Sequence, residues 1–213
     1  MIQATIFDFD GLLLDSEPLW DEADNILLKK RGSTPTQNLY LKVLGTGQKD
    51  TIETYKKEFN ILEDTNALIE ERVAIFDDLL NKNMRLMSGA KEILEHFKKK
   101  GTVMAIATGG HTKNRLNDIL NHLKIREYFS VLAAREAVKK GKPDPAIYLF
   151  AAKKLKIDPK DCLVLEDAPN GVIAGKKAGM HVIGIGTKPI IRQMLQTAGA
   201  DRVFTSLSEI QFN

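Results

Sequence analysis

Short apolar runs alternate with longer amphipathic stretches along most of this 213-residue chain. The short runs are rich in β-branched residues, which is typical of buried strands. Strands are expected over residues 4–9, 103–107, 131–133, 163–166, 181–185 and 202–204. Helices are expected over residues 90–99, 113–123, 145–156, 172–178 and 190–198. Strands separated by helices predict an α/β fold: a Rossmann-like parallel sheet with helices on both faces.

Residues 15–85 depart from this rhythm, because no strand pattern occurs in them. Helices are expected over residues 18–30, 49–59 and 65–82, and the last of these carries an apolar stripe of Ile69, Val73, Phe76 and Leu80. The spacing of the stripe indicates packing. An all-helical block inserted after the first strand predicts a small cap over the carboxyl edge of the sheet, where open α/β sheets bind ligands. We therefore expect a core of residues 1–14 and 86–213 and a helical cap of residues 15–85.

Composition narrows the class of protein. The net charge is +3, and the lysine-rich stretches contain no interleaved aromatic residues, so a nucleic-acid platform is not expected. The single cysteine, Cys162, excludes an internal disulfide. No apolar stretch is long enough to span a bilayer, and no secretory leader is visible. We expect a cytoplasmic protein with no membrane attachment, and no obligate protein partner is indicated.

Polar residues follow the first apolar run in the stretch Asp8-Phe9-Asp10-Gly11. In an extended chain Asp8 and Asp10 project to the same side. Two carboxylates so close repel each other unless a cation lies between them or one of them is protonated. Both arrangements suit catalysis, with one carboxylate as nucleophile and the other as acid and base. The alternative is an exposed strand end whose acids cap a helix.

Two further elements could bind a phosphate. Thr108 and Gly109 follow the second apolar run and could offer hydroxyl and backbone donors to an anion, although a threonine that caps the next helix is the more common pattern. Lys142 lies in the proline-stiffened stretch Gly141-Lys142-Pro143-Asp144-Pro145. A rigidly placed ammonium suits a dianionic phosphate, whereas a lysine considered alone is usually a solvated surface group.

The fourth element is the pair Glu166-Asp167, which closes another apolar run. Adjacent acids in this position are costly unless they are paired or bound to a metal. Oxygen ligands of this kind suit Mg²⁺. The alternative is helix capping before Pro169.

The order and spacing of these elements resemble the haloacid dehalogenase-like superfamily, and the helical insert resembles the small cap of its β-phosphoglucomutase-like and sugar-phosphatase branch. The matching stretches are Asp8-Phe9-Asp10-Gly11-Leu12-Leu13-Leu14-Asp15-Ser16-Glu17, Thr108, Gly141-Lys142-Pro143-Asp144-Pro145 and Glu166-Asp167-Ala168-Pro169-Asn170-Gly171. The two glycines after Thr108, where relatives often have serines, depart from the pattern and imply a backbone phosphate donor.

The resemblance implies a role for each matching residue. Asp8 would attack phosphorus and form an aspartyl-phosphate, and Asp10 would protonate the leaving oxygen and then activate water. Mg²⁺ would be held by Asp8, the backbone carbonyl of Asp10 and Asp167, with Glu166 binding directly or through water. The transferring phosphoryl group would be bound by Thr108, the backbone of Gly109, and Lys142. A halide-removing dehalogenase needs no metal, so the second acid and the Glu166-Asp167 pair count against that activity.

The expected activity is hydrolysis of a small phosphomonoester, either a sugar phosphate or a nucleotide-derived one. The alternatives are a phosphosugar mutase and a phospho-ligand binding protein without turnover; the intact acidic set opposes the latter. Candidate substrate contacts in the cap are Trp20, Gly45 and Gln48, although Trp20 could equally be packing and Gly45-Thr46-Gly47-Gln48 could be a plain turn. The mutase branch usually has a His and an Arg in these stretches, so their absence here favours water as the final acceptor.

Overall fold

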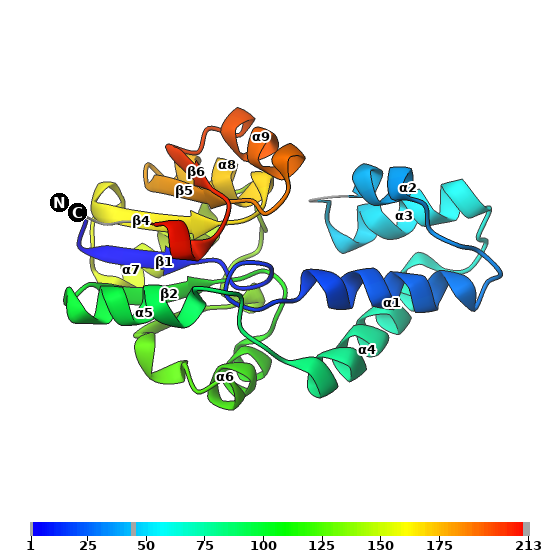
Figure 1. Ribbon diagram of the computed structural model, residues 1–213, viewed down its shortest axis with the longest axis horizontal. Coiled ribbons are helices and arrows are strands. Elements are labelled where there is room, and N and C mark those ends of the chain that lie inside the picture. Colours follow the sequence, from blue (N-terminus) through cyan, green and yellow to red (C-terminus); the bar gives the residue numbers. More distant parts are fainter. Residues whose placement is uncertain (1, 44–45, 211–213) are drawn as a thin grey trace. The chain divides into compact units, whose positions relative to one another are not determined.

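The computed structural model describes residues 2–43 and 46–210 (Figure 1). The chain divides into two compact units, one formed by Met1–Asp15 with Arg85–Asn213 and the other by Ser16–Met84. We call the first the core unit and the second the helical unit. Their behaviour as a separate catalytic core and cap, with the boundaries expected from the sequence, stays a prediction.

The core unit contains a six-stranded sheet in the order β3-β2-β1-β4-β5-β6, and every described strand pair is parallel. The strands are β1 (Ala4–Phe7), β2 (Val103–Ala107), β3 (Val131–Ala133), β4 (Cys162–Glu166), β5 (His181–Ile185) and β6 (Arg202–Phe204). All residues of β1 are buried, which explains its apolar sequence. In register, Phe7 pairs with Ile106 of β2 and Leu165 of β4, so these three strands end level with one another.

Helices flank this sheet, as Figure 1 shows. They are α5 (Ala90–Lys99), α6 (Lys113–His122), α7 (Ala146–Leu155), α8 (Pro169–Lys177) and α9 (Pro189–Thr197), with short 3₁₀ turns at Arg126–Tyr128, Arg135–Ala137, Pro159–Asp161 and Leu207–Glu209. Their starts follow local rules, since the Thr112 side chain caps α6 and Pro169 opens α8. The expected α/β, Rossmann-like fold class is confirmed.

The helical unit consists of α1 (Glu17–Lys29), α2 (Gln37–Val43), α3 (Gln48–Phe59) and α4 (Thr65–Asn83). The short helix α2 was not expected from the sequence. Apolar residues of all these helices form one core, which contains Leu27, Leu28, Leu39, Ile52, Tyr55 and Leu68.

The buried stripe of α4 differs from the expected one. Phe76 and Leu80 are buried as predicted, whereas Ile69 and Val73 are only half-buried. The buried positions of α4 recur every four residues, and the one before Phe76 is Arg72, which is 7% exposed. Its guanidinium pairs with Asp24 of α1 through Nε to Oδ1 at 2.5 Å and Nη2 to Oδ2 at 2.9 Å. A charged residue therefore occupies a core position, which apolar periodicity alone cannot predict.

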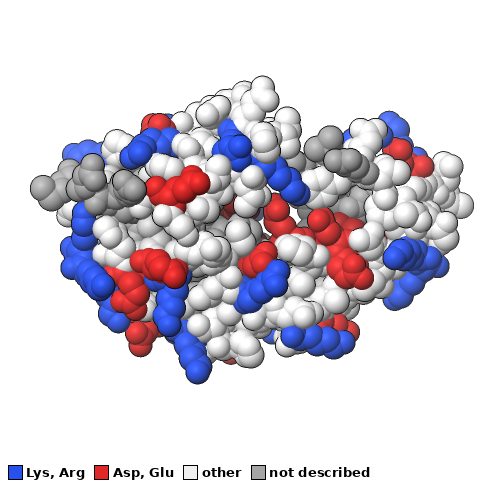
Figure 2. Space-filling model, in the orientation of Figure 1, with Lys and Arg blue, Asp and Glu red and all other residues white. Residues whose placement is uncertain are grey.

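The surface carries both signs of charge. On the face shown in Figure 2, Lys and Arg are interspersed with Asp and Glu over the core unit. Such mixing of signs on this face is typical of an ordinary protein surface. Within residues 2–43 and 46–210, no helix has the length and apolar character needed to cross a membrane.

Candidate active site

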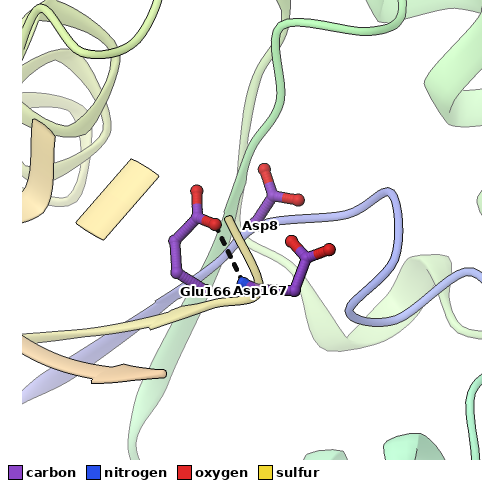
Figure 3. A group of neighbouring side chains, drawn as sticks. All are labelled: Asp8, Glu166 and Asp167. Carbon is purple, nitrogen blue, oxygen red and sulfur yellow. Dashed lines mark hydrogen bonds between the residues drawn. The ribbon is translucent and has the colours of Figure 1, made fainter. Parts of the chain in front are cut away.

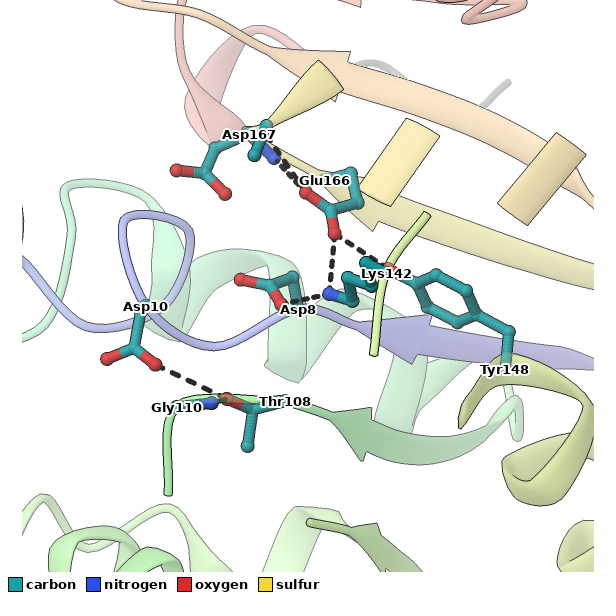
Figure 4. Close-up of polar contacts among 9 residues, drawn as sticks. Asp8, Asp10, Thr108, Gly110, Lys142, Tyr148, Glu166 and Asp167 are labelled. Atoms are coloured by element: carbon teal, nitrogen blue, oxygen red, sulfur yellow. Dashed lines mark hydrogen bonds and ion pairs between the residues drawn. The ribbon is translucent and has the colours of Figure 1, made fainter. Parts of the chain in front are cut away.

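Four of the expected site residues lie at the carboxyl edge of the central strands. Asp8 follows β1, Thr108 follows β2, Glu166 ends β4, and Asp167 comes directly after it. Because these strands are parallel and in register, their polar ends meet at one edge of the sheet. Lys142 reaches this edge from the loop before α7 (Figure 4).

Lys142 is the centre of a buried ion-pair network. Its ammonium donates hydrogen bonds to Asp8 Oδ1 and, at 2.6 Å, to Glu166 Oε1. The side chains of Lys142, Asp8 and Glu166 are 15%, 11% and 1% exposed. Burial by itself lowers the pKa of Lys142, but the carboxylates of Asp8 and Glu166 outweigh burial and raise that pKa well above its ordinary value. Lys142 is thus a fixed positive charge beside Asp8.

Asp8 sits in an unusual electrostatic environment. Burial is the main cause that raises the pKa of Asp8 to about 7, Glu166 and Asp10 add to the rise, and Lys142 opposes it. The positive charge of Lys142 alone therefore does not keep the Asp8 carboxyl group fully ionised near neutral pH. A further cation at this position would favour the ionised form, which is the form that can act as a nucleophile.

Glu166 is the most completely bonded acid of the site. Its Oε1 accepts from Lys142 and, at 2.8 Å, from the hydroxyl of Tyr148, while Oε2 accepts from the backbone N–H groups of Asp167 and Ala168 at 2.9 Å each. A carboxylate has about four acceptor sites, and these four donors occupy them, so a metal ion that bound Glu166 would have to displace or share one of these bonds. Glu166 therefore anchors Lys142, whatever further role it has.

Gly171 of α8 provides the space for that carboxylate. A Cβ at this position would lie 1.6 Å from Glu166 Oε1. Any larger residue would displace Glu166, so the glycine at this point in the helix is required by close approach rather than by backbone angle.

The acids can hold a metal ion. Asp8, Glu166 and Asp167 each offer a carboxylate oxygen, and these atoms lie within 4.8 Å of one another (Figure 3). Hard oxygen donors at this spacing, around an aspartate whose pKa is raised by burial, fit a divalent cation such as Mg²⁺. The Asp10 carboxylate is not in this group and is bonded elsewhere. Metal binding by the Asp10 backbone carbonyl stays a prediction.

The Asp10 carboxylate lies against the residues that follow β2. Thr108 Oγ1 donates to Asp10 Oδ2 at 3.3 Å, and Nε2 of His111 lies 2.9 Å from Asp10 Oδ1. Gly110 rather than Gly109 is sterically constrained here, because a Cβ on Gly110 would come within 2.5 Å of Asp10 Oδ2, whereas one on Gly109 would meet nothing within 4 Å. Phosphate binding by Thr108 and Gly109 stays a prediction.

Sequence reasoning missed two residues of this site. His111 comes directly after the glycines that follow Thr108, and this proximity was a signal that could have been used. Tyr148 is a fully buried aromatic residue on α7, and nothing local distinguishes it from an ordinary core residue.

The expected substrate contacts lie in the helical unit. Trp20 of α1 stacks on Phe76 with ring centroids 3.7 Å apart and planes at 8°, and the Arg72 guanidinium lies 4.4 Å from its ring centroid. These contacts favour the packing interpretation of Trp20. Gln48 is the first residue of α3, and Gly45 lies outside the described residues. Substrate contact by any of them stays a prediction.

Comparison with known proteins identifies the family. Residues 5–185 match the sequence model of the haloacid dehalogenase-like hydrolases, so the chain belongs to this family. It is 33% identical over 195 residues to a phosphorylated carbohydrates phosphatase of Thermotoga maritima, covering 85% of this chain and 84% of the relative. It is 31% identical over 211 residues to hexitol phosphatase B of Escherichia coli, covering 98% and 94%.

A solved structure described as a putative β-phosphoglucomutase from Thermotoga maritima is also similar. Its TM-score is 0.80 at 28% identity, and the match covers 98% of this chain and 96% of that one. The expected superfamily and branch are confirmed by these likenesses. The expected enzyme class, a phosphomonoester hydrolase of this family, is confirmed as well.

Proposed function

We propose that this enzyme is a magnesium-dependent phosphatase that hydrolyses a small sugar phosphate or nucleotide-derived phosphomonoester through an aspartyl-phosphate on Asp8. The observation that carries the proposal is the buried contact of Asp8 with Lys142, beside the carboxylates of Glu166 and Asp167. The names of its relatives, which act on phosphorylated carbohydrates and hexitol phosphates, support the substrate class.

The proposed reaction transfers the phosphoryl group in two steps, first to Asp8 and then to water. In the first, an Asp8 carboxylate oxygen attacks phosphorus, the bond to the leaving oxygen breaks, and Asp10 gives that oxygen its proton. In the second, Asp10 takes a proton from water, the water oxygen attacks phosphorus, and the bond to Asp8 breaks. Inorganic phosphate leaves, and both aspartates return to their starting states.

The surrounding residues supply charge and position. Lys142 would neutralise the phosphoryl oxygens while Glu166 holds its ammonium in place, and the Thr108 hydroxyl and Gly109 backbone would add donors. Asp8, the Asp10 carbonyl and Asp167 would hold Mg²⁺, with Glu166 contributing directly or through water. When bound, the ion would supply positive charge to the transferring group and keep Asp8 ionised.

A phosphosugar mutase is the second candidate, favoured by the similarity to the structure described as a putative β-phosphoglucomutase. A mutase must hold a bisphosphate intermediate and therefore needs a second cationic clamp. Gln48 carries no charge, and Lys49 could supply only a point charge without the fork geometry of arginine. We therefore place the phosphatase first.

A turnover screen tests this proposal. Phosphate release is measured with Mg²⁺ against a panel of sugar, polyol and nucleotide-derived monoesters. We expect release from at least one of the sugar or polyol phosphates, and no release from any member would contradict the proposal. In a second assay with β-glucose 1-phosphate and a trace of the bisphosphate, glucose 6-phosphate that forms faster than free phosphate would establish the mutase instead.

The partner is a small phosphorylated metabolite in the cytoplasm, and the reaction requires no nucleic acid, membrane or obligate protein partner. Activity of the purified chain alone in the same screen would be consistent with this.

A further inference from the structure

His111 is held firmly beside Asp10. Only 7% of its surface is exposed, and its ring packs edge-on against Phe9, with centroids 5.8 Å apart and planes at 79°. Its backbone carbonyl accepts a hydrogen bond from the N–H of Arg135 at 3.0 Å. The ring is therefore packed against Phe9, and the backbone of His111 is held by the chain after β3.

The donor of the hydrogen bond between His111 and Asp10 follows from the protonation state of Asp10. In the proposed cycle Asp10 is ionised after it has protonated the leaving oxygen, and an ionised carboxylate has acceptors only, so in that state the 2.9 Å contact to Oδ1 is a donation from the Nε2–H of His111. A protonated Asp10 that carries its proton on Oδ2 would keep Oδ1 as an acceptor for the same donor. The second oxygen, Oδ2, has the longer contact of 3.3 Å with the Thr108 hydroxyl. His111 thus makes the shorter of the two side-chain contacts that orient this carboxylate.

The chain after β2 is shaped to allow this approach. Gly110 has no side chain where a Cβ would come within 2.5 Å of Asp10 Oδ2, and its N–H donates to Thr108 Oγ1 at 3.1 Å. Next to these residues, Thr112 begins α6 by capping it and takes no part in the contact. The short stretch between β2 and α6 therefore lies in close contact with the Asp10 carboxylate and leaves space for it at Gly110.

We propose that His111 is a positioning residue for Asp10, which it orients for proton transfer to and from the substrate. The inference rests on the proposed function, in which Asp10 acts as acid and base. A general acid works only within hydrogen-bond reach of the atom it protonates, and active sites commonly orient such a group through a third residue.

The test uses leaving groups that differ in their need for a proton. An alkyl phosphate releases a poor leaving group and depends on the acid, whereas p-nitrophenyl phosphate does not. The parameter kcat/KM reports the steps up to leaving-group release, so it isolates the acid role of Asp10. Because misplacement of a catalytic group by about 1 Å costs on the order of 100-fold, we expect His111→Ala to lower kcat/KM by about 10- to 100-fold for the best alkyl substrate. For p-nitrophenyl phosphate we expect a change of no more than about threefold, since acid catalysis contributes little there.

Two further variants sharpen this comparison. His111→Gln retains a side-chain N–H donor of similar reach and should restore most of the alkyl activity. Thr112→Ala is the matched control, because it perturbs the same helix start without touching Asp10 and should leave both substrates unchanged. Equal losses for alkyl and aryl substrates in His111→Ala, or no loss for either, would overturn the proposal.

A measurement independent of turnover separates this inference from the proposed function. In ¹⁵N-labelled protein, the shifts of the imidazole nitrogens show which one carries the proton. We expect a protonated Nε2 at His111 and a changed pattern in Asp10→Ala. A bare Nε2 that is insensitive to Asp10→Ala would refute the contact even in an active enzyme. Conversely, a protein that hydrolyses no phosphomonoester but shows the expected shifts would refute the proposed function and keep the contact.

Discussion

The Nζ atom of Lys142 lies 2.6 Å from Oε1 of Glu166, whose side chain is only 1% exposed. This contact holds the ammonium in place independently of Asp8, the other carboxylate to which it donates. If Lys142 binds the transferring phosphate, as proposed, its ammonium could give up the bond to Asp8 and still be positioned by Glu166. This role would account for the presence of so completely buried an acid at the end of β4.

Asp8→Asn should abolish turnover while the fold survives, because an amide oxygen is a poor nucleophile and the side chain keeps its size. By analogy with enzymes whose nucleophile acts as part of a unit, kcat should fall by roughly 10⁶-fold. Asp161→Asn is the control, since Asp161 lies before β4, at the opposite edge of the sheet, and should retain activity. A folded Asp8→Asn protein within tenfold of the parent would exclude the covalent mechanism.

Mg²⁺ should stabilise the protein, and increasingly so as the pH rises. The pKa of Asp8 is raised from 3.8 to about 7 in the folded chain, so between these values the folded state binds the proton more tightly than the unfolded state. The contribution of Asp8 to the stability of the metal-free protein therefore falls as the pH rises from 3.8 to about 7. Because a metal competes with the proton for Asp8, its effect should be larger at pH 8 than at pH 5.

Thermal unfolding with and without the ion measures this effect. At a hundredfold excess over the dissociation constant, Mg²⁺ should add about 2.7 kcal/mol at pH 8. Asp167→Asn should lose most of that gain, and exhaustive chelation should abolish phosphatase activity. A gain that is the same at both pH values would contradict the assignment of Asp8 as a ligand.

Tyr148→Phe should have a modest effect. The change removes the 2.8 Å hydrogen bond to Glu166 Oε1, but Lys142 and the backbone donors remain, so a loss of about 1 kcal/mol is expected. Lys142 is 5.0 Å from the ring centroid of Tyr148, and that contact survives in phenylalanine. We expect kcat to fall by a few-fold, since Lys142 is held less firmly.

Tyr128→Phe is a matched control for this change. Tyr128 also donates to a glutamate, Glu95, but away from the strand ends that carry the site. It should lose comparable stability by thermal unfolding without any change in kcat. Equal kinetic effects in both variants would show that Tyr148 has no specific role in the site.

Gly171→Ala should damage both stability and activity. Its Cβ would meet Glu166 Oε1 at 1.6 Å, and the displaced carboxylate would release Lys142. Overpacking typically costs about 1–3 kcal/mol. Gly109→Ala, whose Cβ meets nothing within 4 Å, should unfold at the parent's temperature. Unchanged unfolding of Gly171→Ala would show that the carboxylate can move aside freely.

Much of the fold could be predicted because burial shapes the sequence directly. The expected ranges of β2, β3, β5 and β6 coincide with the strands. For β2, β3 and β5 the reason is that a parallel sheet covered on both faces needs mainly apolar residues. The acids Asp8, Glu166 and Asp167 could be placed together for a related reason, because parallel strands that end in register bring their last residues to one edge.

What could not be predicted depends on partners far away in the chain. Arg72 occupies a core position of α4 because Asp24, which lies 48 residues away, neutralises it, and no periodicity records that pairing. His111 and Tyr148 likewise acquire a role only through Asp10 and Glu166, each brought in by another strand. The helix α2 was missed because its brief seven-residue length leaves little room for a periodic pattern.

The buried pair of Arg72 and Asp24 should control the stability of the helical unit. Two hydrogen bonds join the side chains, at 2.5 and 2.9 Å, and the Tyr55 hydroxyl donates to the same carboxylate at 2.8 Å. Burial, with a further contribution from Asp24, raises the pKa of Tyr55, so Tyr55 remains a donor throughout the neutral range. With Arg72 removed, Asp24 would be a buried charge with only a neutral donor.

Arg72→Met should therefore destabilise this unit by about 3–5 kcal/mol, which is typical when one partner of a buried pair is removed. Replacing both partners, as in Asp24→Leu with Arg72→Met, should recover most of the loss because no charge is then left buried. Arg72→Lys should fall between these values, since an ammonium cannot form the two-pronged contact. Trp20 is the only tryptophan in the sequence and stacks on Phe76, so its fluorescence during urea unfolding reports on this unit specifically. If the double variant were no more stable than Arg72→Met alone, the cost would come from lost packing over Trp20, 4.4 Å from the guanidinium, and not from an unpaired Asp24.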